Sequence, residues 1–520
     1  MEIGLLFAQG ASRPADLSDF IDSEFADLNL GDKRRSARLR TLLRCMLDSP
    51  MKNISSACRG WAETIGAYRL LGNKRVDSKA ILAPHREATI QRARQHDCVA
   101  VAQDTTELDY TRKKSLRGSG PLTKERRGFY AHTQLVISRE RVPLGVLGTN
   151  IFARDDEDFR RSRKHDPIED KESYRWIQGY LECCEFKAQL ADTEVLSISD
   201  REGDIYELYD CWQKRLREGK STAQWLVRAS QNRTLLDGAG KPLRKEAEGD
   251  KIVHLFEQVR QGREFGEIQF EVKAAEQKKK VKGSTVITQR QARLVRQRIT
   301  ACEVTPRPPQ RKGGNAGGRQ SEPVSFHAVL AEEIDPPDGQ EPITWLLLTS
   351  RRIESFEDAR ELIGFYLGRW EIEVFHRVLK TGCRVEELQL RDSGAVINAL
   401  SLYMIVAWRI LYLTHLGRSC PELPCGVVFE EAEWKSVVLV ERAAQAKKKK
   451  SGGKQDGTKG RGGGKLTEPS LAEMVRLVAK QGGHLGRERD GPPGAQVMWQ
   501  GLARVRNFAE AWQAFGDPDA

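Results

Sequence analysis

The feature that most constrains the fold is a change in the hydrophobic period of the chain near residue 98. Residues 1–79 lack strand-like alternation and are rich in helix formers. From residue 98 onward, apolar segments typical of strands alternate with helical segments, in the order strand, strand, strand, helix, strand, helix, strand. The predicted strands are 98–108, 130–138, 144–153, 194–199 and 224–229, and the predicted helices are 171–189 and 204–217. This order predicts a mixed sheet covered by helices, and therefore an α/β core.

The composition changes twice more along the chain. Residues 232–343 hold alternating segments separated by turn-rich and very basic stretches, which predicts a largely β insertion. Residues 445–466 are rich in lysine and glycine, can bury almost nothing, and are predicted to form a disordered loop. The other predicted elements are a buried strand at 345–349 and helices at 354–381, 395–416, 471–480 and 497–515.

Length and charge set broad limits on the class of protein. A chain of 520 residues that is 39% hydrophobic can fill the cores of two or three domains. Its 85 Lys and Arg against 73 Asp and Glu leave a net charge of +12, which suggests a polyanionic partner such as nucleic acid. Residues 278–320 and 447–465 carry net charges of +11 and +7, so the rest of the chain is acidic. These two segments are therefore predicted to bind a DNA backbone nonspecifically.

No segment predicts export or membrane insertion. The N-terminus lacks the basic and apolar regions of a signal peptide. The longest apolar stretch, 395–413, is interrupted by Asn398 and Arg409, which favours a buried amphipathic helix over a membrane span. The ten cysteines lack the paired spacings of a zinc site or a secreted disulfide framework. We therefore expect reduced thiols in a cytoplasmic protein with no membrane partner.

Two aspartates stand at the ends of predicted strands. Asp104 follows the apolar run 98–103, and Asp200 follows 194–199. A rigid strand fixes the position of such a carboxylate while its head reaches solvent, which suits a functional site. Taken alone, an aspartate after a strand is more often a turn residue or a helix N-cap, and that alternative stays open.

Four polar residues share one face of the predicted helix 354–381. Tyr366, Arg369, Glu373 and Lys380 are offset by 0, 3, 7 and 14 residues, which places them at about 0, −60, −20 and −40° around a helix. A helix that packs on a core normally presents apolar residues on its buried stripe. The alternative is an exposed face with ion pairs, because Arg369 and Glu373 are spaced i, i+4. The aromatic content of the stripe argues against that alternative.

The residue types suggest one chemistry. Two Asp and one Glu that converge would supply hard oxygen ligands for two Mg²⁺ or Mn²⁺ ions. Two such ions activate water or a 3′-hydroxyl and stabilise the leaving oxygen in phosphodiester transfer. Tyr366, Arg369 and Lys380 would then bind the phosphates that flank the scissile bond. The sequence therefore predicts a metal site and a phosphate site beside one helix.

Four motifs carry a resemblance to a known family. They are Gln103-Asp-Thr-Thr-Glu-Leu108, Ser199-Asp-Arg-Glu-Gly-Asp204, Trp345-Leu-Leu-Leu-Thr349, and the spaced set Tyr366, Arg369, Glu373 and Lys380. Through them the chain resembles the DDE transposases of the bacterial insertion-sequence-four family, to which the transposon-five enzyme belongs. The similarity runs through almost the whole chain, and the four-residue helix pattern is its most specific part.

The resemblance implies an architecture of three domains. These are a helical DNA-binding domain over 1–78, an α/β, ribonuclease-H-like catalytic domain over 79–390 with the β insertion at about 232–343, and a helical dimerisation domain over 391–520 that contains the loop at about 445–466. It also implies cut-and-paste transposition, through a hairpin intermediate, by a homodimer that grips two transposon ends. The partner is double-stranded DNA, as transposon ends and as the target to which the 3′-hydroxyl ends are joined.

Roles for the central residues follow from the resemblance by position. Asp104, Asp200 and Glu373 would hold two Mg²⁺ ions, for which Mn²⁺ can substitute. Tyr366, Arg369 and Lys380 would bind the phosphates at the transposon end.

Further DNA contacts are implied in the same way. Trp345 matches the tryptophan on which a flipped base stacks, although its apolar strand alone favours a core residue. Trp370 matches a second aromatic at that site. The remaining implied DNA contacts are His376, Arg377, Arg228, Arg34, Arg35, Arg38 and Arg69.

Two other functions stay open at this stage. One is a catalytically silent, transposase-derived regulator that occupies element ends without cutting; all seven chemical positions are intact, which favours an active enzyme over it. The other is a metal-dependent nuclease outside transposition, which would need neither a second DNA-binding region nor a dimerising C-terminus. An active bacterial enzyme of this kind would be cytoplasmic and associated with the nucleoid.

Overall fold

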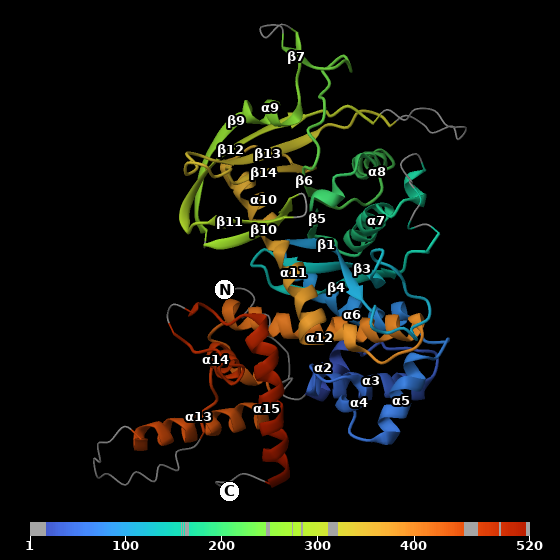
Figure 1. The fold of residues 1–520 in the computed structure, drawn as a ribbon, viewed down its shortest axis with the longest axis vertical. Helices are drawn as coiled ribbons and strands as arrows, with labels where there is room; N and C mark the ends of the chain where they lie inside the picture. Colours follow the sequence, from blue (N-terminus) through green and yellow to red (C-terminus); the bar gives the residue numbers. More distant parts are fainter. Residues whose placement is uncertain are drawn as a thin grey trace. The chain divides into compact units, whose positions relative to one another are not determined.

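The computed structural model describes residues 17–157, 159, 161, 166–245, 250–272, 274–281, 284–309, 321–451, 466–487 and 490–515 (Figure 1). The chain divides into two compact units. Unit 1 comprises the described residues of Met1–His96, Thr105–Arg161 and Glu371–Ala520, and unit 2 those of Asp97–Asp104 and Ser162–Trp370. All ten cysteines are free, as the sequence predicted.

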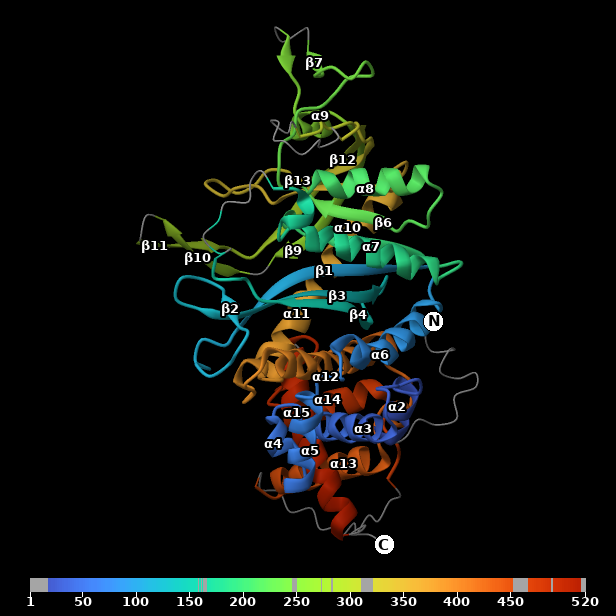
Figure 2. The ribbon, with the colours of Figure 1, turned by 90° about the vertical axis from the view of Figure 1, so that its right-hand side faces the viewer.

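Unit 2 is built on a mixed sheet (Figures 1 and 2). Its strands, in spatial order, are β1 (Cys98–Asp109, of which residues up to Asp104 belong to this unit), β5 (Glu194–Ser199), β6 (Gln224–Arg228), β14 (Thr344–Thr349), β13 (Phe326–Glu333), β12 (Arg293–Val304) and β9 (Arg263–Val272). The first three run parallel and the others pair antiparallel. The parallel strands are almost wholly buried, as expected where crossover helices cover a sheet.

Helices precede and follow the central strand β5. They are α7 (Tyr174–Ala188) and α8 (Tyr206–Arg217), which lie side by side in Figure 2. Both begin or end within three residues of the predicted helices 171–189 and 204–217. The order of strands and helices that the sequence predicted is confirmed, and with it the α/β fold class.

The predicted β insertion at 232–343 contains three strands that continue the sheet of unit 2 and two small separate sheets. The small sheets pair β7 (Arg244–Lys245) with β8 (Lys251–Ile252), and β10 (Ala275–Val281) with β11 (Ser284–Arg290). The insertion also contains a short helix, α9 (Leu255–Arg260), which the alternating pattern did not predict. Leu255 and Val259, spaced i, i+4, are its buried residues. Most of the Pro-Gly-basic stretch of the insertion, residues 310–320, lies outside the described residues.

Unit 1 contains antiparallel strands and a central buried helix. Strand β3 (Arg127–Ser138) pairs with β4 (Pro143–Phe152) and with the short β2 (Gly120–Pro121). Against β4 pack α6 (Ser78–Ala93) and α12 (Ser393–Ser419). The indole of Trp408 on α12 donates to the carbonyl of Pro143 at 2.8 Å.

Helix α12 is long and apolar enough to cross a membrane by length and composition alone. In the structure, 83% of its most apolar 18-residue window is buried within the protein, and Asn398 donates to the carbonyls of Leu71 and Val76. A core helix passes the same test, so the prediction of a buried helix is confirmed. The prediction that this helix is amphipathic was wrong, because it is surrounded on nearly every side by other helices and by β4.

The N-terminal part of unit 1 is helical, as predicted. Its helices are α2 (Leu17–Glu24), α3 (Lys33–Asp48), α4 (Ile54–Ala57) and α5 (Trp61–Leu71). Asp32 caps α3, because its carboxylate accepts from the backbone N–H groups of Arg34 at 2.8 Å and Arg35 at 3.2 Å. Leu39, Leu42 and Leu43 lie on the buried face of α3.

The C-terminal part of unit 1 is also helical, with α13 (Glu431–Ser451), α14 (Leu471–Gln481) and α15 (Ala495–Phe515) around an apolar core. The predicted loop at 445–466 begins later than expected, because α13 continues through Ser451. Alanine, glutamine and lysine are good helix formers, and residues 443–450 consist of these three types. Residues 452–465 of the predicted loop lie outside the described residues.

Candidate functional site

The two predicted aspartates lie at equivalent positions on adjacent parallel strands of unit 2. In the register of β1 and β5, Ala102 is paired with Ile198, and each aspartate follows two residues later. Neighbouring strands lie about 4.8 Å apart, so this register brings Asp104 and Asp200 to the same end of the sheet.

Asp104 stands where β1 leaves the core. The residues from Cys98 to Gln103 are buried, and Asp104 is the first that is partly exposed. Its Oδ2 lies 3.9 Å from Nη1 of Arg369, and the two side chains are 21% and 12% exposed. The guanidinium of Arg369 also lies over the ring of Tyr366, 6.0 Å from its centroid. Three residues of the predicted site therefore lie together in unit 2.

Asp200 lies in a tight turn after β5. Its Oδ1 accepts from the backbone N–H of Glu202 at 2.8 Å and caps the 3₁₀ turn Arg201–Gly203. Gly203 is required in that turn, because a Cβ there would lie 2.1 Å from the hydroxyl of Ser199. The N-cap alternative for this aspartate is thus realised, and the cap fixes the direction of the carboxylate.

The predicted helix 354–381 is not one regular α-helix. Helix α10 (Phe356–Gly368) ends at a turn at Arg369, α11 (Trp370–Arg377) follows, and residues Val378–Gly382 form a π-helical turn. The single stripe calculated at 100° per residue is therefore wrong beyond Arg377. In a π turn the hydrogen bond joins backbone groups five residues apart instead of four, so the later side chains no longer follow the α-helical spacing. Such turns are frequent at functional sites. Tyr366 is only 8% exposed, so the alternative of an exposed, ion-paired face is also wrong for this residue.

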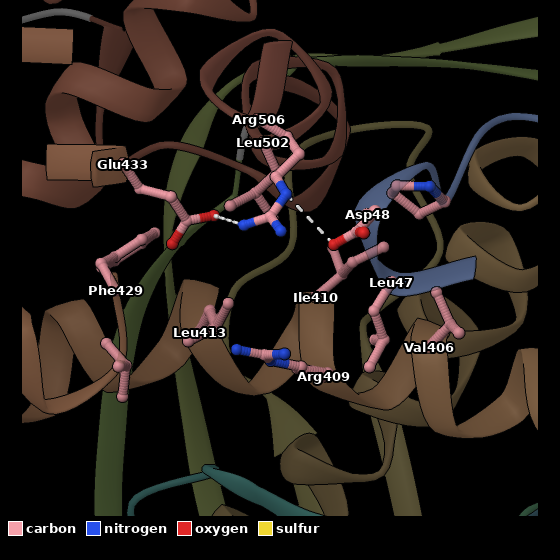
Figure 3. A pocket seen from close by; sticks show the side chains of 12 residues that line it. Leu47, Asp48, Val406, Arg409, Ile410, Leu413, Phe429, Glu433, Leu502 and Arg506 are labelled. Atoms are coloured by element: carbon pink, nitrogen blue, oxygen red, sulfur yellow. Dashed lines mark ion pairs between the residues drawn. The ribbon is translucent and has the colours of Figure 1, made fainter. Parts of the chain in front are cut away.

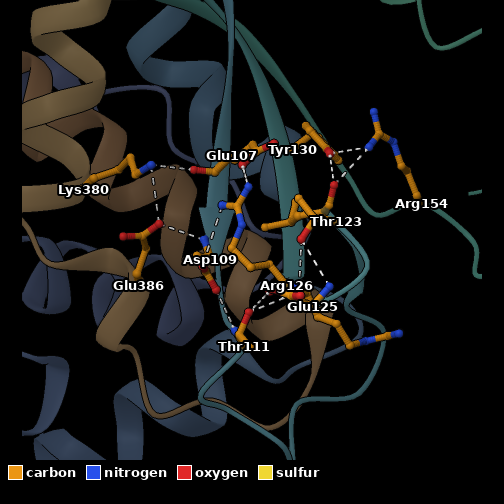
Figure 4. A network of polar contacts seen from close by, with 12 residues as sticks. Glu107, Asp109, Thr111, Thr123, Glu125, Arg126, Tyr130, Arg154, Lys380 and Glu386 are labelled. Carbon is orange, nitrogen blue, oxygen red and sulfur yellow. Dashed lines mark hydrogen bonds and ion pairs between the residues drawn. The ribbon is translucent and has the colours of Figure 1, made fainter. Parts of the chain in front are cut away.

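Glu373 and Lys380 belong to unit 1. Glu373 is half-buried on α11, and Lys380 lies in the π turn. The Lys380 ammonium donates to the carbonyl of Glu107 at 2.8 Å and lies 3.6 Å from Oε1 of Glu386 (Figure 4). This cation is therefore held between a backbone oxygen and a carboxylate.

The surroundings of Lys380 were not predicted from the sequence. Arg126 pairs with Glu107 at 2.6 Å and lies 3.8 Å from Asp109 (Figure 4). Burial by itself would raise the pKa of Asp109, but hydrogen bonds from Thr111 and the charges of Arg126 and Lys380 hold that pKa below its usual value. We name Lys380, Arg126, Glu107, Asp109 and Glu386 the open cluster. Glu107 and Lys380 lie in motifs that the sequence analysis singled out, whereas Arg126, directly before β3, was not predicted.

Trp345 is half-buried rather than part of the core. Its ring is stacked on Phe270 of β9, with centroids 5.6 Å apart and planes at 13°. The four residues that follow it in β14 are buried, so the buried part of the strand begins directly after this tryptophan. Arg228 donates to the carbonyl of Thr344 at 3.4 Å, beside Trp345. Phe270 was not among the predicted residues, because nothing in the sequence connects it with Trp345.

The remaining predicted DNA contacts differ in exposure. Trp370 is 53% exposed and Arg377 is exposed, whereas His376 is 5% exposed and packs beside Phe375. A contact between His376 and DNA would require this ring to become accessible. In the N-terminal helices, Arg34, Arg38 and Arg69 are exposed. Arg35 is half-buried and donates to the carbonyl of Leu30 at 2.8 Å, so its side chain stabilises the segment that precedes α3.

The donor chemistry suits magnesium or manganese. Asp104, Asp200 and Glu373 offer only carboxylate oxygens, the ligands these ions prefer. Within the described residues, no group of three or more His, Cys, Asp or Glu lies close enough to hold a metal ion. Two of the three carboxylates belong to unit 2 and the third to unit 1.

A second polar cluster of unit 1 lies beside a small cavity (Figure 3). Arg506 of α15 lies 3.1 Å from Asp48 at the end of α3, 2.9 Å from Glu430 and 3.8 Å from Glu433. Burial raises the pKa of Asp48 and of Glu433. We name these four residues the buried cluster. It connects the N-terminal helices with the C-terminal helices within unit 1.

Two sequence families match the chain. The family described as transposase DNA-binding matches residues 17–76, and the family described as transposase Tn5 dimerisation domain matches residues 405–515. The first match covers the N-terminal helices with the exposed arginines. The second covers most of α12 and all of α13, α14 and α15.

Proposed function

We propose that the chain cuts DNA at the ends of a mobile element and joins the freed 3′-hydroxyl ends to target DNA. Its two matched segments identify it as a Tn5-like transposase. The matched segments support binding to DNA and assembly as a homodimer. The α/β sheet with its β insertion between helical ends is the arrangement expected of a ribonuclease-H-like transposase.

The observation that carries the catalytic part of the proposal is the position of two carboxylates in unit 2. Asp104 and Asp200 follow the same registered pair of adjacent parallel strands, and Arg369 lies 3.9 Å from Asp104. With Glu373 they would hold two Mg²⁺ ions, for which Mn²⁺ can substitute. When bound, such ions supply activation of water or of a 3′-hydroxyl and stabilisation of the leaving oxygen.

The protein groups around the carboxylates have roles of their own. Tyr366, Arg369 and Lys380 bind the phosphates of the transposon end, because a phenol, a guanidinium and an ammonium are all donors to phosphate oxygens. Arg369 already lies between an aromatic ring and a carboxylate, which limits its rotamers before DNA binds. Lys380 is held by Glu107 and Glu386 and exchanges these acceptors for a phosphate.

Trp345 serves the hairpin step of the proposed reaction. A flipped base stacks on its indole, since a strained tight turn of DNA costs less when one base is extruded. One face of the indole is covered by Phe270, so the base uses the other face. Trp370, Arg377, Arg228, Arg34, Arg38 and Arg69 are further contacts with double-stranded DNA. The enzyme acts in the bacterial cytoplasm, in association with the nucleoid.

The test uses purified protein, Mg²⁺ and a duplex that carries the inverted repeats flanking its own gene. The wild type is expected to cleave this duplex, and Asp104→Ala, Asp200→Ala and Glu373→Ala are each expected to lose cleavage while they still bind. Full cleavage by any of these variants would contradict the metal assignment. Binding without cleavage by the wild type would instead identify a catalytically silent regulator of element ends.

A further inference from the structure

Trp61 is the most exposed tryptophan of the described part of the chain. It is the first residue of α5, and 78% of its surface is exposed. Burying its large apolar ring against a partner would be favourable, and an aromatic ring beside cations is the combination that nucleic-acid surfaces use. Trp61 lies inside residues 17–76, which match the transposase DNA-binding family.

The geometry of α5 places Trp61 on its outer face. At about 100° per residue, Trp61, Ala62 and Arg69 fall within one sector of about 100°, and all three are exposed. Ala67, Leu70 and Leu71 lie on the opposite, buried side. The outer face of α5 therefore presents an indole at one end, the partly buried Ile65 one turn later and a guanidinium two turns later.

Arg38 extends this surface onto α3. Its guanidinium lies against Gly66 of α5, because a Cβ at Gly66 would be 3.0 Å from Cζ of Arg38. Arg38 and Ala62 also line the same cavity between the two helices. The exposed side of α3 and the outer face of α5 thus form one continuous surface, which contains Trp61, Arg38 and Arg69.

The charges on this surface are available to an anion. Among the described residues, no carboxylate forms an ion pair with Arg34, Arg38 or Arg69. Arg40 and Arg59, by contrast, pair with Asp22 at 3.4 Å and Asp48 at 3.1 Å. Glu63, the acid nearest in sequence on α5, is half-buried and accepts from the backbone N–H of Arg59. Within the described part of the chain, this surface therefore combines cations that pair with no carboxylate and one large apolar ring.

We propose that Trp61 is a DNA-contact residue, whose indole packs against sugars and bases of the transposon end while Arg34, Arg38 and Arg69 hold the adjacent phosphates. This inference rests on the DNA binding of the proposed function and adds a contact that carries no charge. Arginine contacts with phosphate release counterions and weaken with salt. Stacking and apolar contact of an aromatic ring release no counterions, so they contribute to affinity at any ionic strength.

The experiment measures affinity for a labelled duplex with the element's own inverted repeat, over a series of salt concentrations. Trp61→Ala is expected to weaken binding about tenfold at every salt concentration, with an unchanged slope of log affinity against log salt. Trp61→Phe is expected to keep most of the affinity. Arg38→Ala is expected to weaken binding and to make the slope shallower by about 1. Leu216→Ala, which removes an exposed apolar side chain from α8, is the matched control and is expected to bind as the wild type does.

Several outcomes would overturn the inference. The inference would be overturned if Trp61→Ala bound DNA with wild-type affinity. It would also be overturned if the loss of affinity came with a lower unfolding temperature, since an exposed indole should not stabilise the fold. A change in oligomeric size of Trp61→Ala without DNA would assign Trp61 to a contact between protein copies instead. If the wild type itself did not bind the repeat, the proposed function would fall together with this contact. Binding by the wild type with no effect at Trp61 would overturn only the contact.

Discussion

The buried cluster and the open cluster of unit 1 contain the same kinds of charge but differ in exposure. The side chains of Arg506, Asp48 and Glu430 are 12%, 5% and 11% exposed, whereas those of Lys380 and Arg126 are 32% and 41% exposed. Water screens the pairs of the open cluster, so each contributes about 0–1 kcal/mol. Exposure, rather than charge, therefore distinguishes the ions expected to stabilise the fold from the ions that solvent screens.

The largest effect on stability is expected from the centre of the buried cluster. Arg506→Met should lower the free energy of unfolding by about 3–5 kcal/mol, because it removes the cation that Glu430, Glu433 and Asp48 share, although Asp48 keeps its pair with Arg59. Urea unfolding of the full chain measures this. Arg504→Met on the same helix is the control, since Arg504 is exposed and, among the described residues, donates to the carbonyl of Gln481 alone. A loss below about 1 kcal/mol for Arg506→Met would mean that its ions are screened like those of the open cluster.

A second buried group of ions in unit 1 should make the free energy of unfolding depend on pH. Glu24 pairs with Arg92 at 2.8 Å and with His85. Burial by itself would raise the pKa of Glu24, yet Arg92 and His85 lower it to about 2. Since the folded-state pKa lies below the unfolded value, this group stabilises the fold above about pH 4.5 and loses that contribution as the pH falls toward 2.

The size of that contribution is about 3 kcal/mol at neutral pH. Glu24→Gln should therefore lower the free energy of unfolding at pH 7, and the difference from the wild type should shrink steadily as the pH falls from 5 to 2. Urea unfolding at a series of pH values measures both. An equal difference at pH 7 and pH 3 would show that the carboxylate charge is not what Arg92 and His85 stabilise.

In the open cluster, a substitution should reduce cleavage strongly but change stability little. Lys380→Met should change the free energy of unfolding by less than about 1 kcal/mol, because its pairs are screened. Cleavage of the transposon end should fall about 100-fold or more, since a positioned cation on the reacting phosphates is lost. Urea unfolding and a cleavage time course are the two measurements. A variant that unfolds easily yet cleaves normally would place Lys380 with the structural ions.

The smallest effect is expected at Arg126, the most exposed cation of the open cluster. Arg126→Ala should lower the free energy of unfolding only slightly, and the difference should vanish at high salt because ions screen its exposed pairs. Unfolding in low and high salt measures this. A salt-independent loss of several kcal/mol would remove the distinction between the two clusters.

The positions of two residues of the candidate site could be predicted because they depend on local pattern. The strand ends at Asp104 and Asp200 were visible as apolar runs followed by a carboxylate, and parallel pairing of the two strands aligned them. The interruption of the helix near Glu373 and Lys380 could not be predicted. Side-chain periodicity reports which residues prefer a helix, whereas Gly382 at the end of the π turn packs against Trp499, far away in the sequence.

By itself, the sequence determined the order of strands and helices, the α/β class and the chemical types gathered at the predicted site, because these depend on residues within a few positions of one another. The tertiary structure alone decided which groups are buried. It placed His376 inside and Trp61 outside, stacked Trp345 on Phe270, and enclosed Arg506 with Asp48 while it left Lys380 partly in water. Burial is set by contacts between residues as much as several hundred positions apart, and no local pattern records them.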